Sequence, residues 1–478
     1  MAPMPDGSLA DQLMRYLTGA RWFAGKGRQG VELRSLTPLP WLTEAGAWPA
    51  VRFEIAEVRY GADDPSAAAT EFYQLPVAYR QVASGLMNHA EIFRPVDPEL
   101  GEVIGYDAMQ DPEACRVIMS QLLDRAWHRQ PGCQVRFHLS GADGLTADLE
   151  PHFYTGQQSN TSVMLGDVAM LKLFRRLELG RNLDIEVHEA LSRFHSADVA
   201  QLYGWVEGSW SAANGEIRHA DLAMAVEKLA DAHDGWGLAL RSLRRGGAFV
   251  DEAAALGRAL AETHEALRSA FPTAQKSGAG VADVMHERLE SAMSAAPSLR
   301  PYANGLGKAF EALGTEAMSV QRVHGDFHLG QTLHTPTGWK IIDFEGEPAK
   351  SLAERQAPDS VWRDIAGMLR SFDYAAASVP GPDSARWAAA CRQAFLEGYA
   401  GGPLEAADTA TLRAYEADKA IYEVIYEVRN RPDWVEIPLA AVAALAASSP
   451  MNGRQADRQQ EALADPAQSG AASTKKEH

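Results

Sequence analysis

The segment HGDFHLGQTLHTPTGWKIIDFEGEP, residues 324–348, carries the densest group of reactive side chains in the sequence. Its middle part, Thr335 to Gly338, is a turn sequence that separates two motifs, and the second motif ends a strand-like run. We therefore expect a loop carboxylate at Asp326, an amide at Gln331 and a strand-end carboxylate at Asp343 to converge.

Phosphoryl transfer from ATP requires a set of this kind. One carboxylate accepts the proton of the attacking hydroxyl, while a carboxylate and an amide oxygen hold Mg²⁺ against the phosphates. Each motif taken alone also fits a turn or a strand end, but the order and spacing of the two together favour catalysis. His324, His328 and His334 suggest zinc as an alternative, although their spacing differs from the HExxH pattern.

A lysine upstream supplies a phosphate-binding cation. Gly166-Asp167 lies between two β-rich apolar runs, which predicts a hairpin with Lys172 near the end of its second strand. A lysine in an apolar strand is costly unless it is paired. The predicted helix Leu183–Phe194 offers Glu186 and Glu189, and Glu186 lies closer to the apolar stripe of that helix. A Lys172–Glu186 pair is the kinase arrangement, and a snorkelling edge-strand lysine is the alternative.

The segment before the hairpin lacks the glycine-rich GxGxxG pattern. It reads GQQSNTS from Gly156, and its small side chains and backbone N–H groups suit the covering of phosphates. The candidate residues are Ser159, Asn160, Thr161 and Ser162.

The helical pattern from Leu412 to Asn430 has two distinct faces. One face is ordinary core and carries Ala417, Ile421, Val424, Ile425 and Val428. The other carries Tyr415, Lys419, Tyr422, Glu423, Tyr426 and Asn430. Tyrosines with carboxylate and amide groups suit a sugar, because rings stack on apolar sugar faces and polar tips bind hydroxyls. A second packing face is the alternative interpretation.

Four charged residues flank the same region: Glu345, Glu347, Arg370 and Asp373. They are either partners of sugar hydroxyls or ion pairs that hold loops, and their spacing does not choose between the two.

Composition narrows the class of protein. The chain has 478 residues, 46% of them hydrophobic, which is ordinary for a globular protein of two or three domains. Its 45 basic and 63 acidic residues give a net charge of −18, which argues against binding of nucleic acid or anionic membranes. No apolar run is long enough for a membrane span, and the N-terminus lacks a signal-peptide pattern. Three scattered cysteines fit a reducing cytoplasm.

The order of patterns along the chain predicts an α+β protein. A helix with a Ser8 cap precedes the stretch RWFAGKGR, which is typical of a corner between helix and sheet, and the β-like segments Val51–Tyr60 and Glu71–Tyr79 follow. From Gly237 onward the pattern is helical and alanine-rich. We predict a β-rich cap at 1–106, an intermediate subdomain at 107–232, a helical C-lobe at 233–450 and a disordered tail at 451–478.

The motifs HGDxHxxQ, IDFEGEP, SLAER, RDxAGMLRSFDYA and YEVxYExRNRPDW resemble those of actinobacterial maltokinases, as do RWFAGKGR, SNTSV and LKLFRR. The resemblance runs from about residue 10 to residue 450 and extends to aminoglycoside-phosphotransferase-like and eukaryotic-kinase-like enzymes. It implies a two-lobed protein-kinase-like fold with an N-terminal β-rich cap, an intermediate subdomain that completes the N-lobe, and a mostly helical C-lobe. The implied activity is phosphorylation of maltose by ATP at the anomeric hydroxyl, to give maltose 1-phosphate.

The resemblance also implies roles for single residues. Asp326 would be the catalytic base, Gln331 and Asp343 the Mg²⁺ ligands, and Lys172 with Glu186 the ion pair. The hinge Met224–Leu229 would offer Glu227 and Leu229 to adenine, although it is more charged here than the family pattern. The candidate sugar contacts are His328, Glu345, Arg370, Tyr422, Glu423 and Tyr426.

The implied protein is a cytoplasmic enzyme with ATP, Mg²⁺ and maltose as its ligands and trehalose synthase as a candidate partner. One alternative is a kinase of glucosamine or an aminoglycoside on the same fold. Another is a pseudokinase that binds without turnover, against which the intact Lys172, Asp326, Gln331 and Asp343 argue.

Overall fold

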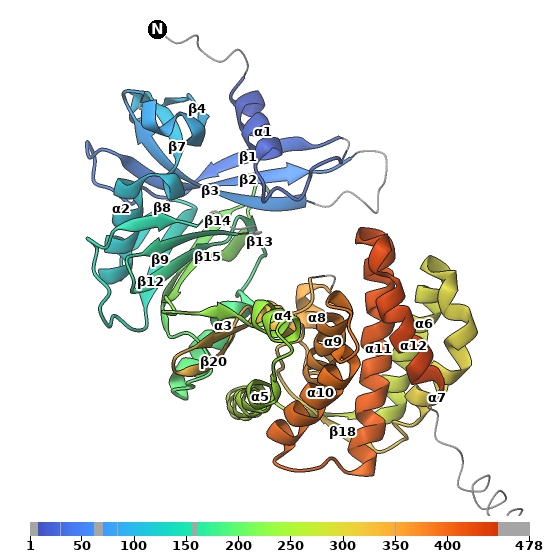
Figure 1. Ribbon diagram of the computed structural model, residues 1–478. Helices are drawn as coiled ribbons and strands as arrows, with labels where there is room; N and C mark the ends of the chain where they lie inside the picture. The colour runs from blue at the N-terminus through green and yellow to red at the C-terminus, as the bar shows by residue number, and fades with distance from the viewer. Residues whose placement is uncertain are drawn as a thin grey trace, which may run out of the picture.

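A computed structural model describes residues 8–28, 30–61, 70–83, 85–154, 160–348 and 350–447. The predicted disordered tail and the candidate phosphate contact Ser159 lie outside these residues. Figure 1 shows three layers: a β-rich cap, a sheet-based N-lobe beneath it, and a C-lobe of packed helices. This is the two-lobed α+β arrangement predicted from the sequence.

The cap is an antiparallel sheet with one helix on it. Ser8 and Asp11 form the predicted capping box at the start of α1 (Leu9–Gly19). The strands run in the order β1-β2-β3-β7-β4: β1 (Glu32–Pro38), β2 (Ala50–Arg59), β3 (Thr70–Arg80), β7 (Ile104–Asp107) and β4 (Glu91–Phe93). The short pair β5 (Val96–Asp97) and β6 (Gly101–Glu102) and the turn η1 (Gly85–Ala90) complete it. Phe23 of the RWFAGKGR stretch is buried against Tyr60 and Tyr73, so this stretch is a packing corner.

The N-lobe is built on a seven-stranded sheet in the order β10-β11-β12-β15-β14-β9-β8. The predicted hairpin forms with Gly166 at φ 53°, which places Lys172 opposite Ser162 on one side and Met224 on the other. The elements are α2 (Pro112–Leu123), β8 (Trp127–Gln130), β9 (Cys133–Leu139), β10 (Pro151–Phe153), β11 (Thr161–Leu165), β12 (Ala169–Leu173), α3 (Leu183–Arg193), β14 (Leu202–Ser211) and β15 (Ile217–Glu227), with η2 (Ala108–Gln110) before α2.

The cap is fastened to the strand that carries the lysine. Directly after β12, β13 (Arg176–Leu177) crosses to the cap and pairs with β3. The buried Arg175 guanidinium lies 2.6 Å from the Asp107 carboxylate, and the Gln74 amide donates to the carbonyl groups of Phe174 and Leu222. Cap and N-lobe therefore form one continuous packed unit.

The C-lobe is mostly helical, as expected from its alanine-rich sequence. Its helices are α4 (Gly235–Arg244), α5 (Val250–Ala270), α6 (Gly278–Ala295), α7 (Ala303–Glu311), α8 (Leu352–Gln356), α9 (Trp362–Ser378), α10 (Ser384–Ala400), α11 (Ala406–Asn430) and α12 (Glu436–Ala447), with short turns η3 (Pro297–Tyr302), η4 (Leu329–Gln331) and η5 (Pro432–Trp434). The core of the lobe contains Ile365 and Phe372 of α9 together with Phe327. Phe327 therefore anchors the segment 324–348 in this core.

Short strands complete the C-lobe. The hairpin β19 (Thr332–Thr335) and β20 (Gly338–Ile341) forms around the predicted turn, and β16 (His233–Asp234) pairs with β19. A second pair joins β17 (Ala274–Ser277) to β18 (Ala317–Val320). Both motifs of the segment 324–348 thus flank one hairpin.

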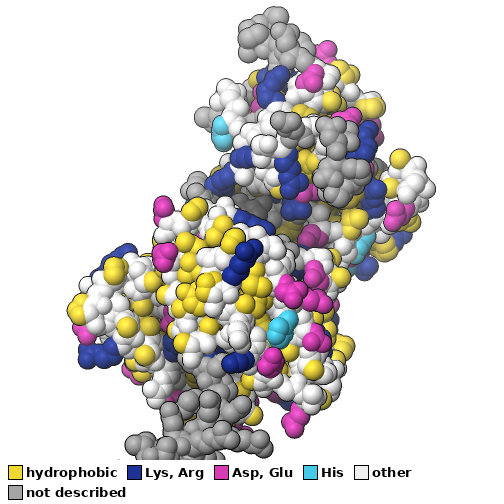
Figure 2. All heavy atoms as spheres, turned by 90° about the vertical axis from the view of Figure 1, so that its right-hand side faces the viewer, with side chains coloured by type: hydrophobic (Ala, Val, Ile, Leu, Met, Phe, Trp, Pro, Cys, Tyr) yellow, Lys and Arg dark blue, Asp and Glu magenta, His cyan; other side chains and the backbone are white. Residues whose placement is uncertain are grey.

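Figure 2 looks onto the side of the molecule that carries α6, α11 and α12, and it shows hydrophobic side chains gathered on the C-lobe. The apolar helix α12 contributes few charges to this side. None of the helices in the described ranges combines the length and apolar character that crossing a membrane requires.

Candidate active site

The loop that carries Asp326 is held by one buried carboxylate. The Asp364 side chain on α9 accepts the backbone N–H of His324 at 2.7 Å and that of Gly325 at 2.8 Å. The ring of His264 lies 2.9 Å from the same carboxylate. Burial would raise the pKa of Asp364, but hydrogen bonding to His264 and its charge bring the pKa below its ordinary value. The loop is therefore fixed by a charge-assisted network.

Close packing against α9 also fixes this loop. A β-carbon at Gly367 of α9 would lie 2.5 Å from the Phe327 carbonyl oxygen, so only glycine fits. The Ser371 hydroxyl, one turn further along α9, accepts the Leu329 N–H at 3.1 Å. The His324 ring donates to the Ile342 carbonyl at 2.9 Å, which ties the first motif to the second.

Asp326 lies on the side of this loop that faces α11. Its carboxylate accepts a hydrogen bond from the Lys419 ammonium at 3.1 Å, and the His328 ring lies 3.9 Å from it. Burial alone would raise the pKa of Asp326, but Lys419 and His328 lower it below its ordinary value. An ionised carboxylate that faces a cavity is what a general base requires.

Gln331 and Asp343 are brought together as predicted. The Ile342 N–H donates to the Gln331 carbonyl at 3.1 Å, and the Gln331 amide nitrogen lies 3.4 Å from the Asp343 carboxylate. Asp343 has φ 66°, in the left-handed region, which directs it away from the line of β20. Rotation of the amide by 180° presents its oxygen to the same point. The pair fits Mg²⁺, which prefers such oxygen ligands.

Lys172 meets three carboxylates. Its ammonium lies 2.9 Å from Asp184, 2.8 Å from Glu345 and 3.5 Å from Asp343. Burial opposes the charge on Lys172, but these carboxylates raise the pKa of the lysine well above its ordinary value. The lysine is paired inside the site, so the snorkelling alternative is wrong.

The prediction that Glu186 forms the ion pair with Lys172 is wrong. The Glu186 carboxylate lies 3.0 Å from the Arg322 guanidinium instead. The rotation of α3 brings Asp184, in its first turn, toward Lys172, and Asp184 also accepts the Phe344 N–H at 3.1 Å. The ion pair that joins sheet to helix is therefore Lys172–Asp184.

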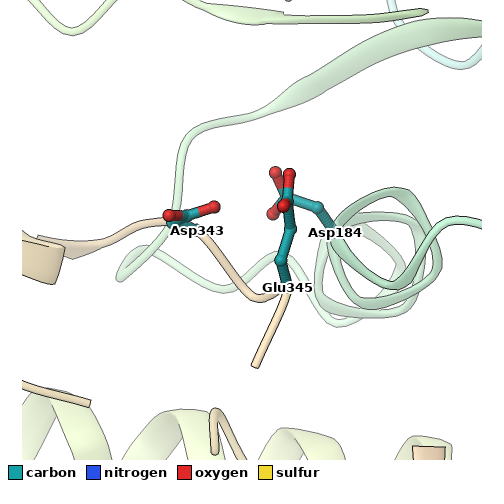
Figure 3. A group of neighbouring side chains, drawn as sticks. All are labelled: Asp184, Asp343 and Glu345. Carbon is teal, nitrogen blue, oxygen red and sulfur yellow. The ribbon is translucent and has the colours of Figure 1, made fainter. Parts of the chain in front are cut away.

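Figure 3 shows how the three carboxylates lie. Asp343 and Glu345 extend from the loop after β20, and Asp184 extends from α3 toward Glu345. One oxygen of each lies within 4.8 Å of the others. Three carboxylates around one ammonium leave an excess of negative charge, which a divalent cation would offset. Asn160, a predicted phosphate contact, lies at this cluster, with its amide 3.4 Å from Glu345.

A cavity of about 790 Å³ opens beside Asp326. Its walls come from the loop that carries Asp326, from α4, α9 and α11, and from the turn after α11. They include Trp236, Asp326, His328, Tyr374, Lys419, Tyr422, Glu423, Tyr426, Glu427, Arg431 and Trp434. Four of the predicted sugar contacts, His328, Tyr422, Glu423 and Tyr426, therefore face one space.

Two predicted sugar contacts lie elsewhere. Glu345 belongs to the cluster around Lys172, because its carboxylate pairs with that ammonium. Arg370 is 3% exposed and pairs with Glu423 and Asp373, each at 2.9 Å, so it holds the wall of the cavity from behind. Neither is among the described residues that line the cavity.

The hinge segment ends the N-lobe sheet. β15 stops at Glu227, whose backbone N–H donates to the Gln201 carbonyl at 2.8 Å, and the Lys228 N–H donates to the Val168 carbonyl at 2.9 Å. Leu229 packs against the N-lobe core, and the chain then enters β16 and α4 of the C-lobe. The segment is thus the link between the lobes.

Sequence reasoning missed several lining residues. Lys419 was assigned only to a polar helix face, and its contact with Asp326 was not predicted. Its spacing of three and seven residues from Tyr422 and Tyr426 is the signal, since these positions share one face of a helix. Trp236 and Trp434 come from segments far apart in the chain, and no local pattern connects them.

Comparisons of the sequence with known proteins identify its relatives. Residues 16–111 match the family model of the maltokinase N-terminal cap domain. Over 322 residues the chain is 30% identical to a glucosamine kinase from Streptacidiphilus jiangxiensis. The alignment covers 59% of this chain and 70% of that protein. The chain belongs to the glucosamine kinase family. A second family member, a glucosamine kinase from Mycolicibacterium smegmatis, is 28% identical over 325 residues, covering 61% and 78% of the two chains.

A solved structure supports the fold of this family member. A glucosamine kinase in complex with glucosamine, ADP and inorganic phosphate superposes with a TM-score of 0.61 at 21% identity, over 93% of this chain and 100% of that one. The predicted kinase-like fold and the predicted resemblance to maltokinases are confirmed. This member of the glucosamine kinase family is a sugar kinase with a maltokinase-type cap.

Proposed function

We propose that the protein transfers the γ-phosphate of ATP to the anomeric hydroxyl of maltose. The observation that carries the proposal is the cavity beside Asp326, which is large, aromatic and balanced in charge. Asp326 accepts the proton of the attacking hydroxyl, because it is ionised and faces this space.

The charge balance of the cavity favours a neutral acceptor. Glu423 is held by two nitrogens of Arg370, at 3.0 and 2.9 Å, and Glu427 lies 2.6 Å from Arg431. Asp326 is paired with Lys419. The three carboxylates among the described lining residues therefore each have a cation of the protein beside them, and the ammonium of an amino sugar would compete with these cations.

The size of the cavity favours a disaccharide. At about 790 Å³ it lies in the upper part of the range for ligand pockets, about 300–1,000 Å³. Five aromatic side chains line it: Trp236, Tyr374, Tyr422, Tyr426 and Trp434. A second sugar ring held by such walls contributes binding energy that orients the reacting ring.

The nucleotide side of the site is the cluster around Lys172. Lys172 would contact the phosphates, with Asp184 holding the ammonium in place. Gln331 and Asp343 would hold Mg²⁺, which offsets the phosphate charge when bound. Asn160 directly precedes β11, whose first two residues are Thr161 and Ser162. The hinge residues Glu227 and Leu229 stay candidates for the adenine side. A trehalose synthase partner and a cytoplasmic location also stay predictions.

Glucosamine is the second candidate acceptor. The 30% identity to a glucosamine kinase favours it, whereas the paired carboxylates favour maltose.

A sugar panel separates the two candidates. Purified protein with ATP and Mg²⁺ is offered maltose, glucose, glucosamine and kanamycin, and ADP release is measured as kcat/KM for each. We expect maltose to have the highest value and phosphorus NMR to show a phosphate on the anomeric carbon, with Asp326→Asn as the inactive control. A highest value for glucosamine would replace the proposed acceptor, and no ADP release above the control with any sugar would overturn the kinase assignment.

A further inference from the structure

Lys419 is placed where no part of the proposed reaction requires a cation. It projects from α11, more than 90 residues after Asp326 in the chain, and yet donates to the Asp326 carboxylate at 3.1 Å. Its side chain is 17% exposed and lies 5.0 Å from the centre of the Tyr422 ring. A mostly buried ammonium costs free energy unless it is paired, and Asp326 is the partner that offsets this cost.

We propose that Lys419 is a positioning residue for Asp326: it holds the carboxylate ionised and directed into the acceptor cavity. The proposal rests on the proposed function, in which Asp326 is the base. Lys419 acts through Asp326, because the ammonium favours the charged form of the carboxylate and fixes its orientation by a direct hydrogen bond.

The other charged groups around the pair do not replace Lys419. His324 and His328 face Asp326 from its own loop, and the Asp326 N–H donates to the His324 ring, which is a contact of the backbone. Burial and the Lys419 charge lower the pKa of His328, so this ring is largely neutral near pH 7. Lys419 is the cation that lies against the carboxylate.

Acidic groups surround the pair on its other sides. Glu347, from the loop after β20, and Glu423, from α11, both act on Lys419, and Asp343 acts on His328. Burial alone would lower the pKa of Lys419, but the charge of Asp326, followed by those of Glu347 and Glu423, raises it above its ordinary value. Lys419 therefore stays charged across the working pH range.

The kinetic test uses Lys419→Met, which removes the charge and keeps much of the length. The acid limb of the pH profile of kcat/KM should move upward by about 1–3 pH units, the effect of an adjacent opposite charge on a carboxylate. The KM for ATP should not change, and kcat should recover toward the wild-type value above the shifted limb. Lys419→Arg should restore the limb, and Lys308→Met, an exposed lysine on α7, is the matched control. An equal loss of activity at every pH would overturn the proposal.

A second measurement needs no substrate. The free energy of unfolding is measured against pH for the wild type, Asp326→Asn, Lys419→Met and the double variant, with circular dichroism as a check on folding. With Lys419 present, the contribution of Asp326 to stability should fall as the pH drops below about 3.8, its ordinary pKa. In the Lys419→Met background the strongest influence that lowers the pKa of Asp326 is gone while burial remains, so the loss of its contribution at low pH should become smaller. The same pH dependence in both backgrounds would overturn the proposal independently of which sugar is the substrate.

Discussion

The Asp364 carboxylate accepts the backbone N–H of His324 at 2.7 Å, so a buried charge in α9 fixes the point where the loop that carries Asp326 begins. The same carboxylate accepts the Gly325 N–H and contacts the His264 ring. The geometry of this loop thus depends on a residue that belongs neither to the cavity lining beside Asp326 nor to the cluster around Lys172.

Asp364→Asn should lower both stability and turnover. An amide has one acceptor oxygen and no charge, so the loop loses at least one charge-assisted hydrogen bond, worth about 1.5–3 kcal/mol. We expect a loss of that size in the free energy of unfolding, measured by urea denaturation, and a lower kcat. Asp383→Asn is the matched control, since Asp383 forms an exposed pair with Arg386. An unchanged unfolding free energy would contradict the anchoring role.

The contribution of Asp364 should depend on pH in a defined direction. Its pKa is lowered in the folded protein, so its stabilising effect is present above its ordinary pKa of 3.8 and is lost as the pH falls through the lowered value. The difference in unfolding free energy between wild type and Asp364→Asn should shrink as the pH falls below about 3.8.

Asp184→Asn should be more damaging than Glu186→Gln. Removal of one partner from a buried charge pair costs about 3–5 kcal/mol, and Asp184 is the buried partner of Lys172. We expect Asp184→Asn to lower kcat/KM for ATP by at least about 100-fold, since 1.36 kcal/mol corresponds to tenfold. Glu186→Gln should stay within about threefold of wild type, because its pair with Arg322 is partly exposed and such pairs contribute little. The reverse order would mean that Lys172 pairs with Glu186 during catalysis.

Asp343→Ala and Gln331→Ala should respond differently to Mg²⁺. Asp343→Ala removes the charged ligand and should abolish activity at every Mg²⁺ concentration that can be used. Gln331→Ala should be milder and partly restored by added Mg²⁺, because water replaces a neutral oxygen ligand. Titration of Mg²⁺ at fixed ATP measures both. Greater damage in the Gln331 variant would make the ligand assignment wrong.

Asp326→Asn should separate turnover from binding. It keeps the size of the side chain and removes proton acceptance, so kcat should fall by about 10²–10⁴-fold. Binding of ADP, measured by calorimetry, should be retained, because the nucleotide cluster around Lys172 is built from other residues. A kcat near the wild-type value would exclude Asp326 as the base.

Tyr426→Ala should affect the sugar and spare the nucleotide. Tyr426 lines the cavity and its ring lies 6.4 Å from that of Tyr422, so its removal opens one wall. We expect a higher KM for maltose and an unchanged KM for ATP. Trp127→Ala, which changes an exposed aromatic residue on the edge strand β8 and outside the cavity lining, is the control. A rise in both KM values would indicate a general disturbance of the C-lobe.

Local patterns in the sequence predicted the elements that carry the site. The Gly166-Asp167 turn located Lys172 on a strand, and the turn at Thr335–Gly338 located the two catalytic motifs on either side of one hairpin. Each of these depends on residues close in the chain, where turn chemistry and alternation are informative.

The partner of Lys172 could not be predicted in the same way. Periodicity gives the apolar stripe of α3, but it does not give the rotation of the first turn against the sheet, which selects Asp184 over Glu186. One signal was present: Asp184 and His188 are four residues apart and form a buried polar pair at 3.1 Å. Tyr415 likewise was assigned to the sugar-facing side of α11, whereas it is 2% exposed and packs beneath Arg363.

The tight contact at Gly367 also bears on how the enzyme opens. Because α9 and the Phe327 backbone leave no space between them, the loop that carries Asp326 cannot slide within the C-lobe. The Arg175–Asp107 pair locks the cap to the N-lobe in a similar manner. The two rigid units are joined by the linker after β15 and also through α3, whose Val187 and Leu191 pack in the C-lobe core. We therefore expect nucleotide exchange to require bending of the linker together with loss of the Lys172–Glu345 contact. The rate of product release should accordingly depend on these connections between the lobes as well as on the residues around Asp326.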